Sequence, residues 1–455
     1  MLGQELFKGK KITVMRIGLL GRGIGDTAYI AEAGAEVLVV DSASQAVMQP
    51  AVDALAEYPN ITFKFGPYDF ADFKDADMVI VGAGAPLDEP VLVEAKKAGV
   101  SLKQSAALFA EISGVPIIGV TGTRGKSTVT LMIHHVLSMV TEGAPVLLGG
   151  NIRGVSNLQL LKEVKEDSLC VMELDSWQLQ GFGWAEISPQ VAVFTSFMPD
   201  HMNYYHDDMD LYFKDKANIY LYQEDSGVLI TTPDVFTWIQ KLSGTLGQEL
   251  ILADASAIPE DCLLAMPGEH NRLNAALAYE ALKATGLTDE EIFDGLASFP
   301  GVPGRLEYLG SHNGIKIYND NNATTPTATA VGIKAVAENK NVILIMGGAD
   351  KGLDIGPLIE ALDDNVKSVI ILPGTGSDNL RQELETTEKY STVNRTIFQP
   401  VSSLKEAVEA GLAKGQPGDV LLFSPAFASF GMYKNEYERN DEFVEIIKSL
   451  ENETK

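Results

Sequence analysis

The residues best suited to chemistry lie in a glycine-rich stretch, GVTGTRGKST, at positions 119–128. A glycine-rich turn between a strand and a helix presents backbone N–H groups and the positive end of the helix dipole to phosphate oxygens. Lys126 can neutralise phosphate charge there, and the hydroxyls of Ser127 and Thr128 can ligate Mg²⁺. Val120 stands where the usual pattern has its first glycine, so we expect a variant nucleotide loop. The alternative is an incidental turn with a solvent-facing lysine.

The elements around this loop alternate as in parallel α/β sheets, where short apolar runs are followed by amphipathic stretches of helix length. The chain opens with a predicted strand at 12–20, a turn GLLGRGIG (18–25), a helix at 26–33 and a strand that ends at Asp41. An acid about twenty residues after such a turn is typical of dinucleotide-binding folds. The glycines do not fit G-x-G-x-x-G well, so we expect a nucleotide here without specifying NAD.

A further strand of this first segment is MVIVGAG (78–84), and the remaining apolar runs predict two more α/β segments. Those runs are VPIIGV (115–120), DSLCVMEL (167–174), QVAVFTSF (190–197), IKIYND (315–320), NVILIMGG (341–348), VKSVIILPG (366–374) and DVLLFSP (419–425). We predict an α/β protein of three domains. These are a Rossmann-like substrate-binding domain at 1–113, a P-loop ATPase-like domain at 114–303 and a Rossmann-like domain at 304–455.

Composition excludes several classes of protein. The 455 residues carry a formal charge of −27, which argues against a nucleic-acid-binding surface and is typical of a well-solvated protein. Only Cys170 and Cys262 are present, so a disulfide framework or a cysteine zinc site is not expected. No apolar run is long enough for a membrane span or a signal peptide, and we expect a cytoplasmic enzyme that acts as a monomer.

The variant loop T-G-T-x-G-K-[ST] resembles that of the Mur ligase family, ATP-dependent enzymes that join an amino acid to a carboxylate. Further stretches resemble the family's motifs in the same order, and ELDSWQLQ is similar to the strand-end motif of its D-glutamate-adding branch. They are GGNIRG (149–154), ELDSWQLQ (173–180), DHMNYY (200–205), DKANIY (215–220), GEHNRLNAALA (268–278), GRLE (304–307), NDNNATTP (319–326), GGADKG (347–352) and SPAFASFGMYKN (424–435). The resemblance covers about residues 10–445.

The resemblance implies that ATP phosphorylates the carboxylate of UDP-N-acetylmuramoyl-L-alanine and that the amine of D-glutamate attacks the acyl phosphate. It assigns ATP contacts to Gly122, Thr123, Gly125, Lys126, Ser127, Thr128, Asn271, Arg305 and Asp320. Because these residues lie in the second and third domains, ATP would bridge them, and closure would exclude water. Asn151 would contact the UDP-sugar, whose uracil end would lie near Gly21 and Asp41.

The resemblance also implies two Mg²⁺ sites, which would offset the repulsion between phosphates and a carboxylate. Ser127 and Glu173 would hold the first ion, and a carboxylate at the end of an apolar strand is costly without a cation. His201 and Lys216 would hold the second, with Lys216 carbamylated by CO₂ into an oxygen ligand. Without the resemblance, Lys216 would be predicted to be an exposed helix lysine.

Thr324, Lys351 and Ser429 match the positions that hold the carboxylates of D-glutamate. The sequence departs from the family pattern at two nearby positions. Asn322 replaces a lysine, and Glu436 replaces an aromatic residue. L-Glutamate or another amino acid therefore stays open as the acceptor. Arg124 stands where the family has asparagine, and it either adds a phosphate contact or points outwards.

Competing interpretations explain less of the chain. The L-alanine-adding branch has histidine at Arg124, and the diamino-acid branch carries a D-N-P motif that is absent. Folate-polyglutamate enzymes share the loop but not ELDSWQLQ or the S-P-A-x-A-S ending. A Rossmann-type redox protein that uses GLLGRGIG would leave the second and third segments without a role.

Overall fold

The computed structural model describes residues 1–453 except 20, 87, 142, 243–245 and 387–397. Its strands form three sheets, and the chain divides into two compact units. The first unit is Met1–Cys262 with Leu273–Leu296, and the second is Leu263–Arg272 with Ala297–Lys455. The three-domain α/β prediction is confirmed by one sheet per expected segment, whereas the boundaries at 113/114 and 303/304 stay a prediction.

The first sheet is parallel, with strand order β3-β2-β1-β4-β5. Its strands are β1 (Lys11–Met15), β2 (Glu36–Asp41), β3 (Ile61–Phe65), β4 (Met78–Val81) and β5 (Ser101–Lys103). The helices of this segment are α1 (Gln4–Phe7), α2 (Arg22–Glu32), α3 (Gln45–Ala54), the 3₁₀ turn η1 (Phe70–Asp72), α4 (Pro90–Lys97) and α5 (Ser105–Ser113). The order reverses between β1 and β4, and ligands of open α/β sheets bind at such a point.

The strand predicted at 12–20 is shorter than expected. β1 ends at Met15, because Arg16 adopts a φ of 58° that an extended strand does not allow. Helix α2 begins at Arg22 rather than at 26, since the second half of GLLGRGIG is helical. Gly23 is required there because a Cβ at this position would lie 2.1 Å from the carbonyl oxygen of Ile17.

The central sheet is also parallel, with order β11-β10-β9-β6-β8-β7. Its strands are β6 (Ile117–Thr121), β7 (Val146–Gly150), β8 (Leu169–Glu173), β9 (Val191–Phe194), β10 (Val228–Thr231) and β11 (Glu249–Leu252). Its helices are α6 (Lys126–Val140), η2 (Gln159–Lys162), α7 (Ser176–Ala185), α8 (Met209–Ala217), α9 (Pro233–Leu242), η3 (Ala255–Ala257), α10 (Glu269–Ala284) and α11 (Asp289–Ser298).

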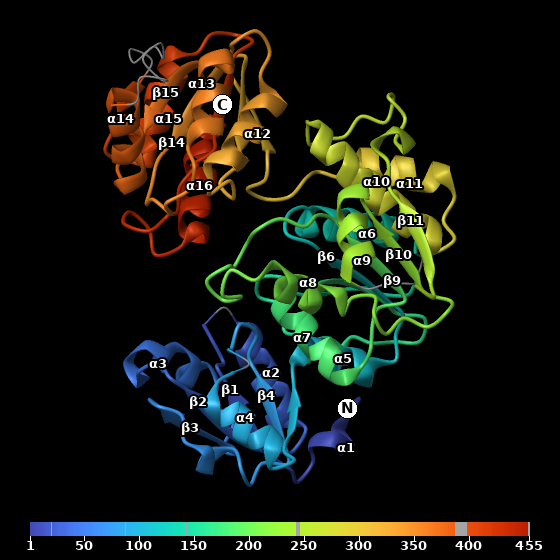
Figure 1. Ribbon diagram of the computed structural model, residues 1–455. Coiled ribbons are helices and arrows are strands. Elements are labelled where there is room, and N and C mark those ends of the chain that lie inside the picture. Colours follow the sequence, from blue (N-terminus) through green and yellow to red (C-terminus); the bar gives the residue numbers. More distant parts are fainter. Residues whose placement is uncertain (20, 87, 142, 243–245, 387–397, 454–455) are drawn as a thin grey trace. The chain divides into compact units, whose positions relative to one another are not determined.

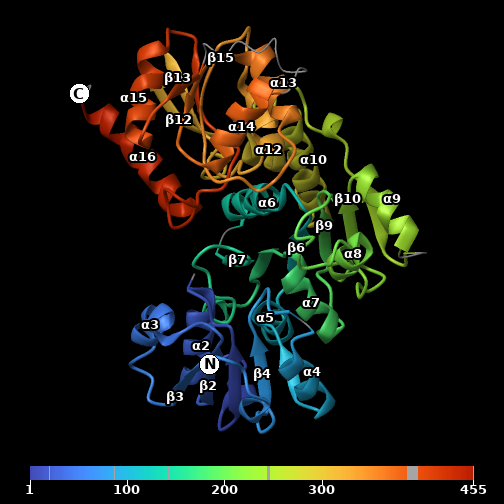
Figure 2. The ribbon, with the colours of Figure 1, turned by 60° about the vertical axis from the view of Figure 1, so that its left-hand side comes forward.

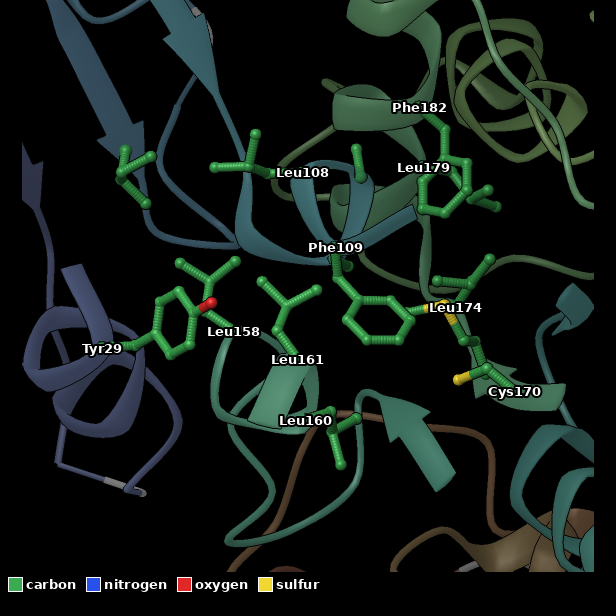
Figure 3. Packing of buried hydrophobic residues seen from close by; sticks show 14 of the residues in the cluster. Tyr29, Leu108, Phe109, Leu158, Leu160, Leu161, Cys170, Leu174, Leu179 and Phe182 are labelled. Carbon is green, nitrogen blue, oxygen red and sulfur yellow. The ribbon is translucent and has the colours of Figure 1, made fainter. Parts of the chain in front are cut away.

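One continuous apolar core joins the first two sheets. Figure 3 shows its centre, where Tyr29 of α2 lies near Leu158 and Leu161 while Phe109 of α5 points towards Leu174. These side chains are buried, so separating the two segments would expose a large apolar surface to water. The shared core explains why both segments belong to a single compact unit.

The third sheet has the order β12-β13-β17-β14-β15-β16, with β12 antiparallel to β13 and the other pairs parallel. Its strands are β12 (Glu307–His312), β13 (Ile315–Asn319), β14 (Val342–Met346), β15 (Val366–Ile371), β16 (Phe398–Pro400) and β17 (Val420–Phe423). Its helices are α12 (Pro326–Val336), α13 (Gly356–Asn365), α14 (Thr375–Thr386), α15 (Leu404–Lys414) and α16 (Glu436–Glu453).

Strand β14 is buried on both sides, as its uninterrupted apolar sequence predicts. Its alternate side chains enter two separate cores. One core contains Leu344 with residues of α12, α13 and α14, and the other contains Ile343 with residues of α15 and α16. Helices thus cover both faces of this sheet (Figures 1 and 2). Among the described residues, we find no helix with the length and hydropathy needed to cross a membrane.

Candidate active site

The phosphate loop lies between β6 and α6, where the sequence placed it. Gly122 has a φ of 143°, and a Cβ there would lie 2.0 Å from Thr195 Oγ1, so no other residue fits. Gly125 has a φ of 87° and precedes the first residue of α6. Lys126 Nζ donates hydrogen bonds to the carbonyls of Gly122, at 2.9 Å, and Thr123, at 3.1 Å. The lysine is therefore folded back onto its own loop.

The other polar side chains of the loop serve different purposes. Thr123 Oγ1 donates to the carbonyl of Met198 and accepts the N–H of the same residue, both at 3.1 Å. Thr128 is buried, at 4% exposure, whereas Ser127 on the first turn of α6 is partly exposed. The Arg124 side chain is exposed. Thr123 thus anchors the loop to the segment after β9, and Ser127 is the more accessible hydroxyl.

Lys216 is buried, with 1% of its surface exposed, which contradicts the exposed position that the residues alone predicted. It lies in α8, and its Nζ donates to the Gly122 carbonyl at 2.9 Å and to Thr121 Oγ1 at 3.4 Å. Burial, with the nearby charge of Lys126 adding to it, holds the pKa of Lys216 well below its usual range. The neutral amine is the form that reacts with CO₂.

Glu173 ends β8 and is 5% exposed. Within the described residues, no hydrogen-bond donor is recorded for its carboxylate, and such a group is stabilised by a cation. His201 is partly buried, with its ring centroid 4.6 Å from that of Trp177. Burial lowers the pKa of His201, which favours the neutral imidazole that binds metals.

These residues fit the Mg²⁺ that the family resemblance implies, on one condition. Among the described residues, no group of three or more His, Cys, Asp or Glu side chains could hold a metal ion. Mg²⁺ prefers oxygen ligands and keeps several waters, so Glu173 and the Ser127 hydroxyl suit a first ion. His201 supplies only nitrogen, and a second ion would gain an oxygen ligand if Lys216 carried a carbamate.

A cavity of about 210 Å³ opens at the carboxyl ends of β1 and β4. Its polar lining comes from Arg16, Arg22, Asp26, Gln104, Ser105, Asn157 and Gln178. Arg22 also donates a hydrogen bond to Asn151 Oδ1, so the structure joins the predicted UDP-sugar contact to the glycine turn. Gly21 directly precedes α2 at this turn. Asp41 does not line the cavity, and its Oδ1 accepts the N–H of Ala43 in the turn after β2.

The two arginines of this cavity were missed by the sequence reasoning. Arg22 stands within GLLGRGIG itself, so a cation inside a glycine-rich turn was the available signal. Arg16 gave no such signal, because it was placed within the predicted strand. Its Nη1 donates to the carbonyl of Gly84 at 2.7 Å in the structure.

A second cavity, of about 280 Å³, lies within the second unit. It is lined by Arg305, Asn322, Thr324, Lys351, Ala428, Ser429, Phe430, Glu436 and Tyr437. All three residues predicted to hold the acceptor are present, and Lys351 Nζ donates to Thr324 Oγ1 at 2.9 Å. Both departures from the family pattern, Asn322 and Glu436, line the same cavity. It combines two cations with hydroxyl groups, which suits a small anionic ligand.

Arg439, which was not predicted, hydrogen-bonds to both of the chain segments that contribute most of the lining of this second cavity. It is 1% exposed, and its guanidinium donates to Asn321 Oδ1 at 2.8 Å, to the Asn321 carbonyl at 3.1 Å and to the Phe427 carbonyl at 3.4 Å. Burial lowers the pKa of Arg439 to about 10. The arginine thereby ties NDNNATTP to SPAFASFGMYKN, and no spacing in the sequence indicates this contact.

Asp320 and Asn271 are buried in the second unit, at 7% and 4% exposure. Asp320 accepts hydrogen bonds from Ser424 Oγ at 2.8 Å and from the Leu306 N–H at 3.2 Å. Burial raises the pKa of Asp320 to about 7. Asn271 Nδ2 donates to the Pro267 carbonyl at 2.9 Å. Contacts of these two residues with ribose or adenine remain predictions.

Comparison with known proteins agrees with this architecture. Residues 10–104 match the MurD-like N-terminal domain of Mur ligases, residues 120–252 the Mur ligase middle domain and residues 304–427 the glutamate ligase domain of Mur ligases. The UDP-N-acetylmuramoylalanine–D-glutamate ligase of Roseiflexus sp. (strain RS-1) is 31% identical, over 97% of this chain and 99% of its own. The chain belongs to the Mur ligase family, whose members are ATP-dependent ligases.

Solved structures show the same fold. The UDP-N-acetylmuramate–alanine ligase MurC of Thermotoga maritima superposes with a TM-score of 0.58 at 20% identity, covering 97% of this chain and 99% of its own. The MurF ligase of the same organism, in complex with ADP, has a TM-score of 0.55 at 16% identity and covers 100% of this chain and 98% of its own. At these identities the likeness concerns the fold alone.

Proposed function

We propose that the protein adds D-glutamate to UDP-N-acetylmuramoyl-L-alanine with ATP, in the cytoplasmic synthesis of peptidoglycan precursors. The relative from Roseiflexus, which matches over nearly its full length, supports this reaction because it is a UDP-N-acetylmuramoylalanine–D-glutamate ligase. The observation that carries the choice of an acidic acceptor is the cavity of the second unit. There Lys351, Thr324 and Ser429 stand together beside Arg305.

The reaction brings the substrate carboxylate, two phosphates and an acidic acceptor together, so the site must neutralise several negative charges. Lys126 leaves the loop carbonyls and binds the phosphoryl group that moves from ATP to the substrate carboxylate. Ser127 and Glu173 would hold one Mg²⁺, and His201 with a carbamylated Lys216 would hold a second. The bound ions would supply positive charge to the phosphate oxygens.

The acceptor enters the cavity of the second unit with its carboxylates towards the cations. Lys351 neutralises one carboxylate, and the hydroxyls of Thr324 and Ser429 donate to oxygens of the acceptor. The free amine then attacks the acyl phosphate, an amide forms and phosphate leaves. No nucleic acid or membrane takes part, and the protein acts as a monomer.

Asn322 and Glu436 line the acceptor cavity and favour a test with several amino acids. Phosphate release from ATP should be measured with UDP-N-acetylmuramoyl-L-alanine and, in turn, D-glutamate, L-glutamate, D-aspartate, L-alanine and meso-diaminopimelate. We expect the highest kcat/KM with D-glutamate and no turnover when the UDP-substrate is omitted. A preference for L-glutamate or for a neutral or diamino acid would overturn the acceptor assignment and leave the ligase assignment standing.

A further inference from the structure

Three side-chain carboxamides line the cavity at the carboxyl ends of β1 and β4, and no step described so far uses them. They are Gln104, Asn157 and Gln178, at 3%, 2% and 4% exposure. They come from separate parts of the first unit, namely the residue before α5, the segment before η2 and the first turn of α7. In a buried carboxamide, both the carbonyl oxygen and the NH₂ group ordinarily have a hydrogen-bond partner.

The carbonyl oxygen of every one of these amides is held by a backbone N–H group. Gln104 Oε1 accepts from Gly181 at 3.1 Å, and Asn157 Oδ1 accepts from Gly150 at 2.7 Å. Gln178 Oε1 accepts from Asp175 at 3.2 Å, as part of the capping box of α7. A backbone N–H can only donate, so the atom it meets must be the oxygen. This removes the usual ambiguity between the two ends of an amide.

The NH₂ ends of the three amides are therefore oriented as well. Within the described residues, no protein acceptor is recorded for any of these three groups. Gln104 Nε2 is the extreme case, because it is shielded from solvent and has no hydrogen-bond partner. A buried donor without an acceptor is costly, and such groups in folded proteins call for an explanation. An acceptor brought by a ligand in the adjoining cavity provides one.

The cavity also contains charged side chains. Arg16 and Arg22 are cations suited to phosphate oxygens. Asp26 Oδ1 accepts hydrogen bonds from Ser156 Oγ at 2.6 Å and from the Leu158 N–H at 2.9 Å, and Ser105, which also lines the cavity, hydrogen-bonds to the same carboxyl group. Besides this carboxyl group, the cavity offers its ligand donors, some charged and some neutral. A nucleotide with anionic oxygens and uncharged carbonyl oxygens matches both sets.

We propose that Gln104, together with Asn157 and Gln178, is a positioning residue that donates its NH₂ group to a carbonyl oxygen of the UDP-linked substrate. The inference rests on the proposed function for the identity of that substrate. The inference concerns the UDP-sugar portion of this molecule, which has two carbonyl sources, the uracil ring and the N-acetyl group of the sugar. Both offer an uncharged oxygen acceptor, so the binding experiment must distinguish between them.

The test measures dissociation constants of UDP, UDP-glucose and UDP-N-acetylglucosamine by calorimetry, with the full-length protein and no ATP. Gln104→Glu keeps an oxygen for the Gly181 N–H and loses the donor, whereas Gln104→Met loses both. Gln159→Glu and Gln159→Met are the matched controls, because Gln159 Nε2 already donates to the Gly25 carbonyl at 3.0 Å and does not line the cavity. Thermal melting of each free variant checks that it is folded.

We expect both Gln104 variants to bind about three- to tenfold more weakly than wild type, and the Gln159 controls to stay within about twofold. An equal loss for all three ligands would place the uracil carbonyl at Gln104, and a loss confined to UDP-N-acetylglucosamine would place the acetyl carbonyl there. Wild-type affinity in folded Gln104 variants would overturn the inference alone. Failure of the wild-type protein to bind any UDP compound would overturn the proposed function together with the inference.

Discussion

The phosphate loop and the acceptor cavity use their lysines in opposite ways. In the first unit, Lys126 and Lys216 both donate to the carbonyl of Gly122, so two amino groups satisfy one backbone oxygen. In the second unit, Lys351 donates to the Thr324 hydroxyl on the wall of an open cavity. The lysines of the loop are turned inwards, and the lysine of the cavity already stands where a ligand would meet it.

These two hydrogen-bonding arrangements indicate how much each region must rearrange to bind its ligand. The loop lysines must exchange backbone carbonyls for phosphate or CO₂, and such an exchange is inexpensive because one set of hydrogen bonds replaces another. The acceptor cavity needs little rearrangement, because the buried Arg439 fixes the two loops that carry its walls. The first region is adaptable and the second is organised in advance.

The largest effect should come from removing the lysine that binds phosphate. We expect Lys126→Ala to lower kcat at least a hundredfold, because an electrostatic contact in the transition state contributes several kcal/mol. The fold should persist, since the hydrogen bonds from Nζ to the Gly122 and Thr123 carbonyls lie within the loop itself. Steady-state phosphate release and circular dichroism check the two parts. Lys334→Ala, at an exposed position of α12, is the control, and near wild-type turnover of Lys126→Ala would remove the loop from the mechanism.

The second prediction concerns Lys216, the buried lysine of α8 that donates a hydrogen bond to the Gly122 carbonyl of the phosphate loop. We expect Lys216→Ala to lose about tenfold or more in activity and to regain part of it with added formate or acetate, which replace the carbamate oxygens. Mass spectrometry of the wild-type protein under CO₂ should show the adduct on Lys216. Lys214→Ala, exposed on the same helix, should keep its activity. An unmodified Lys216 with no chemical rescue would contradict the carbamate.

The third prediction compares a buried carboxyl group from each unit. Asp320 accepts hydrogen bonds from Ser424 and Leu306, whereas the described residues supply no hydrogen-bond donor to the Glu173 carboxylate. The pKa of Asp320 is raised to about 7, so the folded protein keeps this proton while the unfolded chain loses it near pH 4. The free energy of unfolding should fall as pH rises from about 4 to 7, by a few kcal/mol.

Asp320→Asn should flatten this part of the pH profile, because an amide does not ionise. Urea unfolding of both proteins between pH 4 and 8 measures the difference, with Glu173→Gln as the comparison from the first unit. An Asp320→Asn protein with the full wild-type slope would show that another group causes the pH dependence.

The smallest effect is expected from restoring a cation to the acceptor cavity. Asn322 lines that cavity, and Asn322→Lys should lower the KM for glutamate about two- to fivefold through one additional charge contact. kcat should change little if the new lysine contacts substrate and transition state equally. Gln382→Lys adds the same charge at an exposed site of α14 and should have no effect. A rise in KM would show that position 322 does not face a carboxylate.

Much of the scaffold could be predicted from the chain itself. Apolar runs such as NVILIMGG and DVLLFSP gave buried strands near their observed places, because strands covered on both faces are continuously apolar. Shorter or less apolar strands were missed, among them β3, whose burial alternates, and β12, whose polar residues hide its pairing. The strand at 12–20 was drawn too long, since the left-handed turn at Arg16 depends on the surrounding fold.

The sequence by itself determined the class of protein and the residues of the phosphate loop, because GTRGKST sets a backbone geometry that acts over a few positions. It also named Thr324, Lys351 and Ser429, whose order along the chain matches a known pattern. The burial of Lys216, the link that Arg439 makes between two distant loops, and the three buried amides at one cavity, with their oxygens held by backbone N–H groups, became visible only in the folded protein. Each of these depends on contacts between residues far apart in the chain, and local sequence carries no record of such contacts.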